Sequence, residues 1–477
     1  MKKILVYLMR FGLQMIYSVL KLFPTKKNKI VFLSRQSDTL TPDFEMVQQE
    51  LRREDPEVEI VTICHRLEGA GSGGLRGMLA FASSTLRSMY HLATASVCVL
   101  DAYWPAISLL HHKKSLTVIQ MWHALGKIKQ SGYQTLGKAS GRGAEMAHLM
   151  KMHENYDYII AGGKAWNPFY EKSFNQPQDK LVNCGLPRID RLLAEREENR
   201  RRFFAAYPEW KEKTIILYAP TFRKNIALHW EALVQAVAAQ NSSALGEAAS
   251  ACRQEAGAAQ GNAAPPEIAQ NAGSYVLIVK GHPNQPLVSD DPVVSNCPDF
   301  RAVDLLAVCD YLITDYSAIA LEGAVLNRPT YYFVYDYEEY REKNGMNIDL
   351  FDVMPGCVFR DADALMQSLA SGSYPQEVLD AYRANYLPEH LGTSTIQIVQ
   401  LIRASGELCA ADLLKSVSIV QSTLSHHMKI LCESGVVACR RQGKWSYYSI
   451  DAEKLEQAAA YLEKMAAAAK AVSGTEE

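Results

Sequence analysis

Short apolar runs alternate with longer amphipathic segments over most of this chain, beginning at Lys29. Short runs rich in Val, Ile and Leu predict buried strands, and the amphipathic segments between them predict helices. This alternation predicts parallel sheets covered by helices, which is an α/β fold. The predicted strands are 30–33, 58–63, 96–100, 118–121 and 158–161 in one series, and 214–217, 276–279, 311–314 and 330–333 in a second.

Two segments separate or interrupt these series. A dense charge run at 195–202, typical of a solvated helix face, precedes Tyr207-Pro208, and we expect a linker between two domains near residues 195–210. Residues 238–273 are rich in Ala, Gln, Gly, Ser and Asn, with few large apolar side chains. Because such a segment cannot offset its ordering entropy, we expect a flexible or partly helical surface insertion there.

The first 24 residues follow another pattern. The apolar runs 4–9 and 11–20 are interrupted by Arg10, flanked by lysines and closed by Pro24. A membrane-spanning helix needs about 20 uninterrupted apolar residues. We therefore expect residues 1–24 to form an amphipathic helix on an anionic membrane surface. The alternative is a first helix that packs on the domain.

Composition narrows the classes of protein. A chain of 477 residues exceeds one ordinary core, so two or three domains are expected. The net charge of −2 excludes general nucleic-acid binding, so any anion site must be local. Ten cysteines without a Cys-x-x-Cys pair indicate a reducing compartment and no zinc framework. No spaced carboxylate cluster suggests magnesium or manganese, and we expect neither a metal nor a cofactor.

Two histidines, His123 and His282, each directly follow a predicted strand and begin a turn that contains Gly and lies beside Lys. Open α/β sheets bind ligands at the carboxyl ends of their strands. Thr221 and Arg223 follow another strand in the same way. The pattern predicts an active site in a cleft between two sheets.

A further strand, 311–314, is followed by Asp315 and Ser317 and then by a predicted helix, 318–326. Free backbone N–H groups at such a helix start attract phosphate. Glu322, inside the helix, is a candidate acceptor for ribose hydroxyls. Each of these strand-end motifs alone more often serves packing or a local hydrogen bond. Six such motifs at equivalent positions of the two halves point to one site.

The order of these motifs closely resembles the CDP-glycerol glycerophosphotransferases of teichoic-acid synthesis. The motifs are Trp122-His123-Ala124, Gly126-Lys127, Gly132-Tyr133, Gly185-Leu186-Pro187-Arg188-Ile189-Asp190, Tyr218-Ala219-Pro220-Thr221, Lys280-Gly281-His282-Pro283, Ile313-Thr314-Asp315-Tyr316-Ser317 and Arg328-Pro329. The resemblance implies a GT-B-like pair of Rossmann-like domains, with an acceptor-side domain at 25–205 and a CDP-polyol-binding domain at 206–395. It also implies transfer of glycerol phosphate from CDP-glycerol to a lipid-linked polyol-phosphate acceptor, with release of CMP, at the cytoplasmic face of the membrane.

Displacement of CMP requires a deprotonated acceptor hydroxyl and a neutralised pyrophosphate. A neutral imidazole suits the first task, so His123 is the expected base and His282 the expected pyrophosphate partner, although these two roles could be exchanged. The family's two motif histidines map onto these positions. The expected substrate-binding residues are Lys127, Arg188, Thr221, Arg223, Lys280, Asp315, Ser317 and Glu322.

The last eighty residues follow the pattern of a winged helix-turn-helix, at 396–477. Helices are predicted at 396–404, 410–416 and 421–432, the last with Leu424, Met428 and Leu431 on its inner face, before a basic hairpin. In this layout one helix enters the major groove of DNA and the wing contacts phosphate. The expected DNA-binding residues are Ser422, Thr423, Ser425, His426, Lys429, Arg440, Arg441 and Lys444.

Within this module, residues 406–413 and 422–429 resemble ArsR-type metalloregulatory repressors. Cys409 is present, but Ala411 stands where metal-sensing members have a second cysteine, so the thiolate site is incomplete. An Ala-rich helix predicted at 458–471 is a candidate dimer contact.

Two alternatives to the transferase stay open. One is an ArsR-type DNA-binding regulator whose large N-terminal region binds a nucleotide-linked polyol as an effector. The other is a GT-B glycosyltransferase with a different nucleotide-activated donor, because one scaffold hosts many donors. The two histidines and Arg223 favour the enzyme, since a pure sensor needs no base. Glycerol and ribitol donors are not distinguished.

Overall fold

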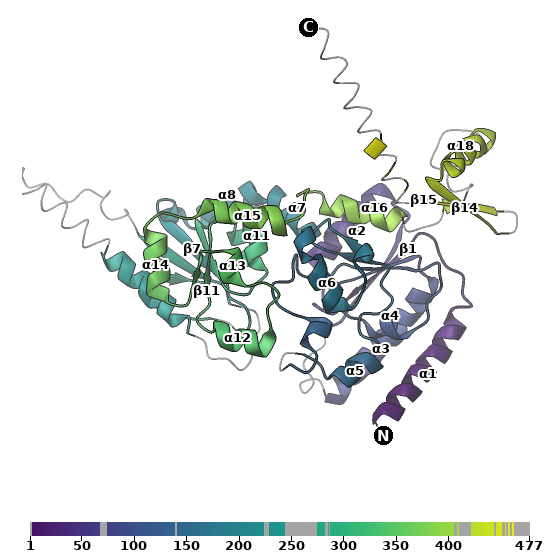
Figure 1. The fold of residues 1–477 in the computed structure, drawn as a ribbon, viewed down its shortest axis with the longest axis horizontal. Coiled ribbons are helices and arrows are strands. Elements are labelled where there is room, and N and C mark those ends of the chain that lie inside the picture. Colours follow the sequence, from purple (N-terminus) through teal and green to yellow (C-terminus); the bar gives the residue numbers. More distant parts are fainter. Residues whose placement is uncertain are drawn as a thin grey trace, which may run out of the picture.

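The computed structural model describes residues 2–66, 74–138, 141–223, 229–243, 274–281, 285, 287–404, 408–409, 421–442, 445–450 and the single positions 454, 457, 460 and 461. Two parallel six-stranded sheets lie side by side, each covered by helices (Figure 1). The predicted α/β fold is therefore confirmed. All nine predicted strands are present, within one or two residues of their expected ends.

The first sheet has the order β2-β1-β3-β4-β5-β6. Its strands are β1 (Lys29–Ser34), β2 (Glu59–Cys64), β3 (Val97–Leu100), β4 (Thr117–Gln120), β5 (Tyr158–Ile160) and β6 (Leu181–Val182). The helices of this half are α2 (Pro42–Glu54), α3 (Gly74–Thr94), α4 (Pro105–Leu109), α5 (Ala144–Leu149), α6 (Asn167–Phe174), α7 (Pro187–Ala194) and α8 (Arg196–Ala206). The charge run expected in the linker forms α8.

The second sheet has the order β12-β11-β10-β7-β8-β9. Its strands are β7 (Thr214–Tyr218), β8 (Tyr275–Val279), β9 (Val294–Ser295), β10 (Tyr311–Thr314), β11 (Thr330–Phe333) and β12 (Val358–Phe359). Its helices are α10 (Ala302–Leu305), α11 (Ile319–Val325), α12 (Tyr337–Asn344), α13 (Leu350–Val353), α14 (Ala362–Ala370) and α15 (Gln376–Tyr386), and residues 231–243 are also helical. Most of the predicted insertion, residues 244–273, lies outside the described residues.

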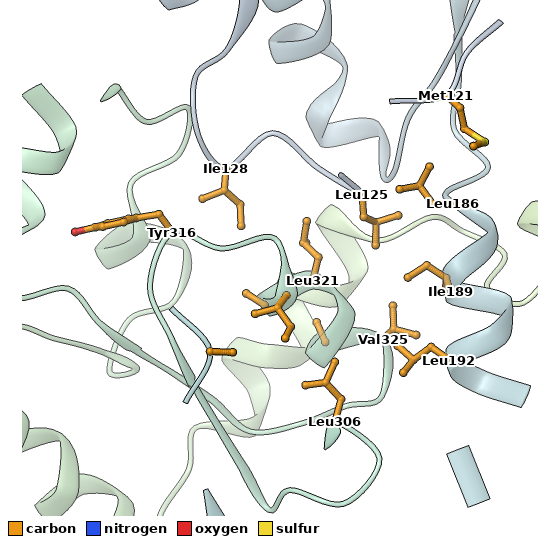
Figure 2. Close-up of a cluster of buried hydrophobic side chains, with 14 of the residues drawn as sticks. Met121, Leu125, Ile128, Leu186, Ile189, Leu192, Leu306, Tyr316, Leu321 and Val325 are labelled. Atoms are coloured by element: carbon orange, nitrogen blue, oxygen red, sulfur yellow. The ribbon is translucent and has the colours of Figure 1, made fainter. Parts of the chain in front are cut away.

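An apolar interface joins the two halves. Figure 2 shows the side chains at this interface. Leu321 and Val325 of α11 face Leu125 and Ile128, which follow β4, and the residues Leu186, Ile189 and Leu192 in or next to α7. At Gly126 a Cβ atom would lie only 2.5 Å from the Trp166 ring and 2.6 Å from Leu321. Close packing at this point therefore requires glycine.

The chain returns to the first half after the second sheet. Helix α16 (Ser394–Ala404) packs against α2 and α7. The Asp190 carboxylate accepts the backbone N–H groups of Ser394 (3.1 Å) and Thr395 (2.6 Å), which anchors the start of this helix. The first helix expected for the C-terminal module thus packs on the first half.

The N-terminal helix α1 (Lys2–Leu20) lies along the outside of the first half (Figure 1). Tyr17 is fully buried and its hydroxyl contacts Nδ1 of His112 at 2.8 Å. Apolar side chains at positions 4, 8, 11, 15 and 19 are all more than half exposed. The inner face holds the helix on the domain, while an apolar stripe faces outward.

The described part of the C-terminal module contains α18 (Gln421–Glu433) and a sheet of β13 (Leu408–Cys409), β14 (Val437–Gln442) and β15 (Trp445–Ile450). Leu424 and Met428 pack with Val437 as a small core, with Cys432 beside them. The prediction that Leu431 faces inward is wrong, since it is 39% exposed. Cys432 continues the four-residue spacing of 424 and 428 and takes the inner position.

Candidate active site

A cavity of about 480 Å³ opens between the two halves at the carboxyl ends of β1, β3 and β4. Most of its wall comes from the first half, and α12 of the second half closes it with Tyr340 and Asn344. His123 lines this cavity, as expected for the cleft that the sequence predicted. The first-half residues of the wall are Arg35, Gln36, Ala102, Tyr103, Trp122, His123, Lys129, Gln130, Ser131, Gly132, Thr135, Gly141, Arg142, Met152 and His153.

His123 is held in one tautomer. Its Nδ1 lies 3.1 Å from the carbonyl oxygen of Asp101, which can only accept, so Nδ1 carries the hydrogen and Nε2 has the lone pair. Burial, together with the positive charges of Lys127, Arg188 and Lys129, outweighs the Asp101 carbonyl and lowers the pKa of His123 to about 4. The imidazole is therefore neutral near pH 7 and can take up a proton at Nε2.

The turn that presents His123 has an unusual backbone. Trp122 has φ 59°, in the left-handed region, and its N–H donates to the Gln120 side chain at 2.9 Å. The Trp122 ring lies over the His123 ring with centroids 4.1 Å apart. These contacts limit the orientations available to the imidazole.

Asp101, which the sequence analysis did not single out, connects two parts of the wall. Its carbonyl holds His123, and its carboxylate accepts the Ser34 hydroxyl at 2.6 Å and the backbone N–H of Arg35 at 3.2 Å. Burial raises the pKa of Asp101 to about 6. Its position directly after the predicted strand 96–100 was the available signal.

Lys127 does not line the cavity. It is 2% exposed, donates to Ser131 (3.0 Å) and Ser173 (3.2 Å), and lies 3.9 Å from the Trp122 ring centroid. Burial holds its pKa well below the usual range. The neighbouring Lys129 lines the cavity, and substrate contact by Lys127 stays a prediction.

Backbone contacts tie the loop after β4 to the second half. The Asn347 side chain donates to the carbonyl groups of Lys127 (2.8 Å) and Lys129 (3.1 Å), and its backbone N–H donates to Ile128 at 2.9 Å. The Gln130 N–H donates to Gly345 at 3.1 Å. Lys129 and Met346 form an isolated antiparallel bridge in this segment, and no sequence pattern indicates the role of Asn347.

Arg223, expected at the pyrophosphate, is buried in an internal ion-pair network. Its side chain has no exposed surface, and its Nη1 lies 2.5 Å from Asp315 and its Nε 2.7 Å from Asp336. Water is excluded there, so the two carboxylates depend on the guanidinium to compensate their charge. The charged atoms of Arg223 and Asp315 thus pair with each other, and their contact with substrate stays a prediction.

Thr221 belongs to the same network through its backbone. Its N–H donates to both oxygens of Asp315, at 2.8 and 3.0 Å. Its buried hydroxyl has no hydrogen-bond partner within the described residues. Thr221 thus keeps a donor group at the carboxyl end of β7, as the sequence predicted.

Arg188 and Glu322 form a charge bridge between the halves. Arg188 donates from Nε (2.8 Å) and from Nη2 to the same carboxylate oxygen of the buried Asp43 of α2, and its Nη1 lies 3.6 Å from Glu322 of α11. Burial raises the pKa of Glu322 despite the nearby guanidinium. These two residues thus contact each other across the interface, and their substrate and ribose contacts stay predictions.

The remaining predicted residues of the second half are placed as follows. Lys280 donates to the Cys297 carbonyl at 2.7 Å, and burial lowers its pKa. Ser317 is half-buried just before α11. His282 lies outside the described residues. No group of three or more His, Cys, Asp or Glu that could hold a metal occurs in the described part of the chain.

In the C-terminal module, Ser422, Ser425, His426 and Lys429 are exposed on α18, and Thr423 is half-buried. Arg440 and Arg441 lie on β14, where only the backbone is described, and Lys444 lies outside the described residues. The helix 410–416 and most of 458–471 also fall outside them.

Comparison with known proteins adds independent findings. The profile of the family CDP-Glycerol:Poly(glycerophosphate) glycerophosphotransferase matches residues 15–404, and that of the bacterial regulatory protein, arsR family, matches residues 395–438. The chain is 28% identical over 394 residues to a teichoic acid ribitol-phosphate primase of Bacillus spizizenii, covering 80% of this chain and 92% of that protein.

Two further relatives agree with these matches. A teichoic acid glycerol-phosphate primase of Bacillus subtilis is 26% identical over 294 residues, covering 60% of this chain and 67% of that protein. The solved structure of the wall teichoic acid polymerase TagF aligns with a TM-score of 0.59 at 17% identity, covering 84% of this chain and 97% of that chain. This last match confirms the predicted GT-B-like fold.

Proposed function

Because the chain belongs to the CDP-glycerol glycerophosphotransferase family, we propose that it transfers glycerol phosphate from CDP-glycerol to a polyol-phosphate acceptor and releases CMP. The geometry of His123 supports this mechanism most directly. Its Nδ1–H is held in place, and its Nε2 is free in the cavity between the halves. The acceptor oxygen attacks the phosphorus that bears glycerol, the bond to the CMP oxygen breaks, and the hydroxyl proton goes to Nε2.

Positive charge for the pyrophosphate comes from residues that retain accessible donors. Lys129 lines the cavity, and burial lowers its pKa while the Asp315 carboxylate of the second half opposes that shift, so we assign its ammonium to the donor side. We assign the Arg223 network a positioning role: Asp315 orients the Thr221 backbone at the end of β7. His282 stays the proposed partner of the pyrophosphate on sequence grounds.

The donor is tested with both polyols. The relatives comprise a ribitol-phosphate primase and a glycerol-phosphate primase, so CDP-glycerol and CDP-ribitol are assayed side by side. Release of CMP is measured with a glycerol-phosphate acceptor, and UDP-glucose serves as the glycosyltransferase control. CMP release from a CDP-polyol supports the proposal. Turnover of UDP-glucose alone would instead support the alternative with a sugar donor.

We also propose that α1 attaches the protein to the membrane surface from the cytoplasmic side, where a lipid-linked acceptor is within reach. By length and composition its segment Lys3–Leu20 could also cross a membrane, and only 6% of it is buried. Tyr17, His112 and Arg10 fasten the helix to the domain along its length, which favours a helix that lies flat.

For the C-terminal module we propose contact with DNA through the exposed face of α18, on the strength of the arsR-family match. Fluorescence anisotropy of the full chain with duplex DNA at low salt tests it. Lys429→Gln should weaken binding and flatten the salt dependence. If the anisotropy is the same with and without duplex DNA, the module has another role.

A further inference from the structure

Two guanidinium groups share one wall of the cavity that contains His123. The Cζ atom of Arg35 lies 5.9 Å and that of Arg142 5.2 Å from the centroid of the Tyr103 ring. Arg35 also donates to the Tyr103 carbonyl at 2.7 Å. Arg142 is exposed. Neither arginine has a role in the mechanism above.

This arrangement favours an anion. Burial lowers the pKa of Arg35 to about 10, and the positive charge of Arg142 adds a smaller contribution in the same direction. An anion between the two cations would offset their repulsion. Planar guanidinium groups match phosphate oxygens in geometry and charge, and they bind phosphate more specifically than an ammonium does.

The backbone of Arg35 is tied to the residue that holds the base. The Asp101 carboxylate accepts the backbone N–H of Arg35, and the Asp101 carbonyl accepts Nδ1–H of His123. The side chains of Arg35 and Arg142 line the same cavity as His123. Asp101 therefore links the backbone of Arg35 to the imidazole of His123.

The position of these arginines favours the acceptor over the donor. The charged and phenolic groups that influence Arg35 are Asp101, Tyr103, Arg142 and Tyr156, all in the first half. Arg142 lies just before α5, and α5 is joined to α1 by the ion pair Lys3–Glu145 and by the bond from Arg10 to the Leu149 carbonyl at 3.0 Å. The wall is thus attached to the helix proposed to lie on the membrane.

We propose that Arg35 and Arg142 form a subsite for the phosphate group of the acceptor, next to the hydroxyl that His123 deprotonates. This inference rests on the proposed function. It makes the enzyme selective for acceptors that already carry a phosphate near the attacking hydroxyl. Polyols without phosphate would enter the same cavity but bind without this charge contact.

Initial rates of CMP release test the subsite with two soluble acceptors, octyl glycerol phosphate and octyl glycerol. Arg142→Ala should raise KM for octyl glycerol phosphate about tenfold, as expected for the loss of one charged hydrogen bond. KM for CDP-glycerol should stay within about twofold, and rates with octyl glycerol should not change. Arg142→Lys should restore part of the affinity. Arg52→Ala, on the exposed face of α2, is the matched control.

Three results would overturn the subsite: an unchanged KM for octyl glycerol phosphate in Arg142→Ala, a rise in KM for CDP-glycerol instead, or an equal loss with both acceptors. If the wild type releases no CMP, the proposed function fails separately. Calorimetry with octyl glycerol phosphate then tests the subsite independently of catalysis. Binding by the wild type but not by Arg142→Ala supports the subsite, and equal binding by both proteins refutes it.

Discussion

Replacement of Arg223 by methionine should destabilise the second half of the molecule more than it alters substrate affinity. The Arg223 side chain has no exposed surface and pairs with Asp315 at 2.5 Å and with Asp336 at 2.7 Å. The Tyr316 hydroxyl donates to the same Asp336 carboxylate at 3.0 Å. Methionine preserves much of the volume but leaves two buried carboxylates without their cation.

The size of the effect follows from this burial. Removal of one partner from a buried ion pair costs about 3–5 kcal/mol in the free energy of unfolding. For a unit of about 150–250 residues, each kcal/mol shifts Tm by roughly 2–4 °C, so the expected fall is roughly 6–20 °C. An exposed pair in the same half provides the control. Arg360 pairs with Glu338 at 2.7 Å with both side chains more than half exposed, and Arg360→Met should cost no more than about 1 kcal/mol.

Thermal unfolding followed by circular dichroism measures both variants, and KM for CDP-glycerol is measured below the transition. We expect a large fall in Tm for Arg223→Met, a small fall for Arg360→Met and a modest change in KM for CDP-glycerol. If Arg223→Met unfolds at the wild-type temperature while KM for CDP-glycerol rises sharply, the internal network is not the role of this residue, and direct pyrophosphate binding is.

Three shorter predictions concern other parts of the molecule. Because the base must be neutral and burial lowers the pKa of His123 from 6.5 to about 4, kcat/KM should show no acidic limb between pH 8 and pH 5, and a limb near pH 6.5 would contradict this. Gly126→Ala places a Cβ atom 2.5 Å from Trp166 and should cost about 1–3 kcal/mol in the free energy of unfolding, whereas Gly143→Ala, with nothing within 4 Å, should not. Phe11→Ser removes a side chain that is 67% exposed and should reduce sedimentation of the full chain with anionic vesicles by roughly tenfold, and undiminished sedimentation would refute surface attachment.

The hydrophobic pattern predicted the sheets well because buried parallel strands are continuous apolar runs. Strands β10 and β11 have the expected bounds. Strands β6, β9 and β12 were missed because two residues are too short to form a run. The position of His123 at the end of β4 could likewise be predicted from its place after such a run.

The partners of charged residues could not be predicted in the same way. Arg223 and Asp336 are 113 positions apart, and Arg188 and Asp43 are 145 apart, so no local pattern links them. Charged residues at strand ends were therefore all assigned to substrate, while the structure pairs several of them with each other. Asp101 and Arg142 were overlooked because a lone acid or a loop arginine carries no periodic signal.

The central claim is that His123 accepts the acceptor proton during transfer of glycerol phosphate. Single-turnover release of CMP from CDP-glycerol, with saturating octyl glycerol phosphate, tests it in wild type and His123→Ala, with CDP-glycerol affinity measured in parallel. We expect His123→Ala to bind CDP-glycerol as the wild type does and to lose about 10²-fold or more in the rate of CMP release. Wild-type rates of CMP release in His123→Ala would contradict it.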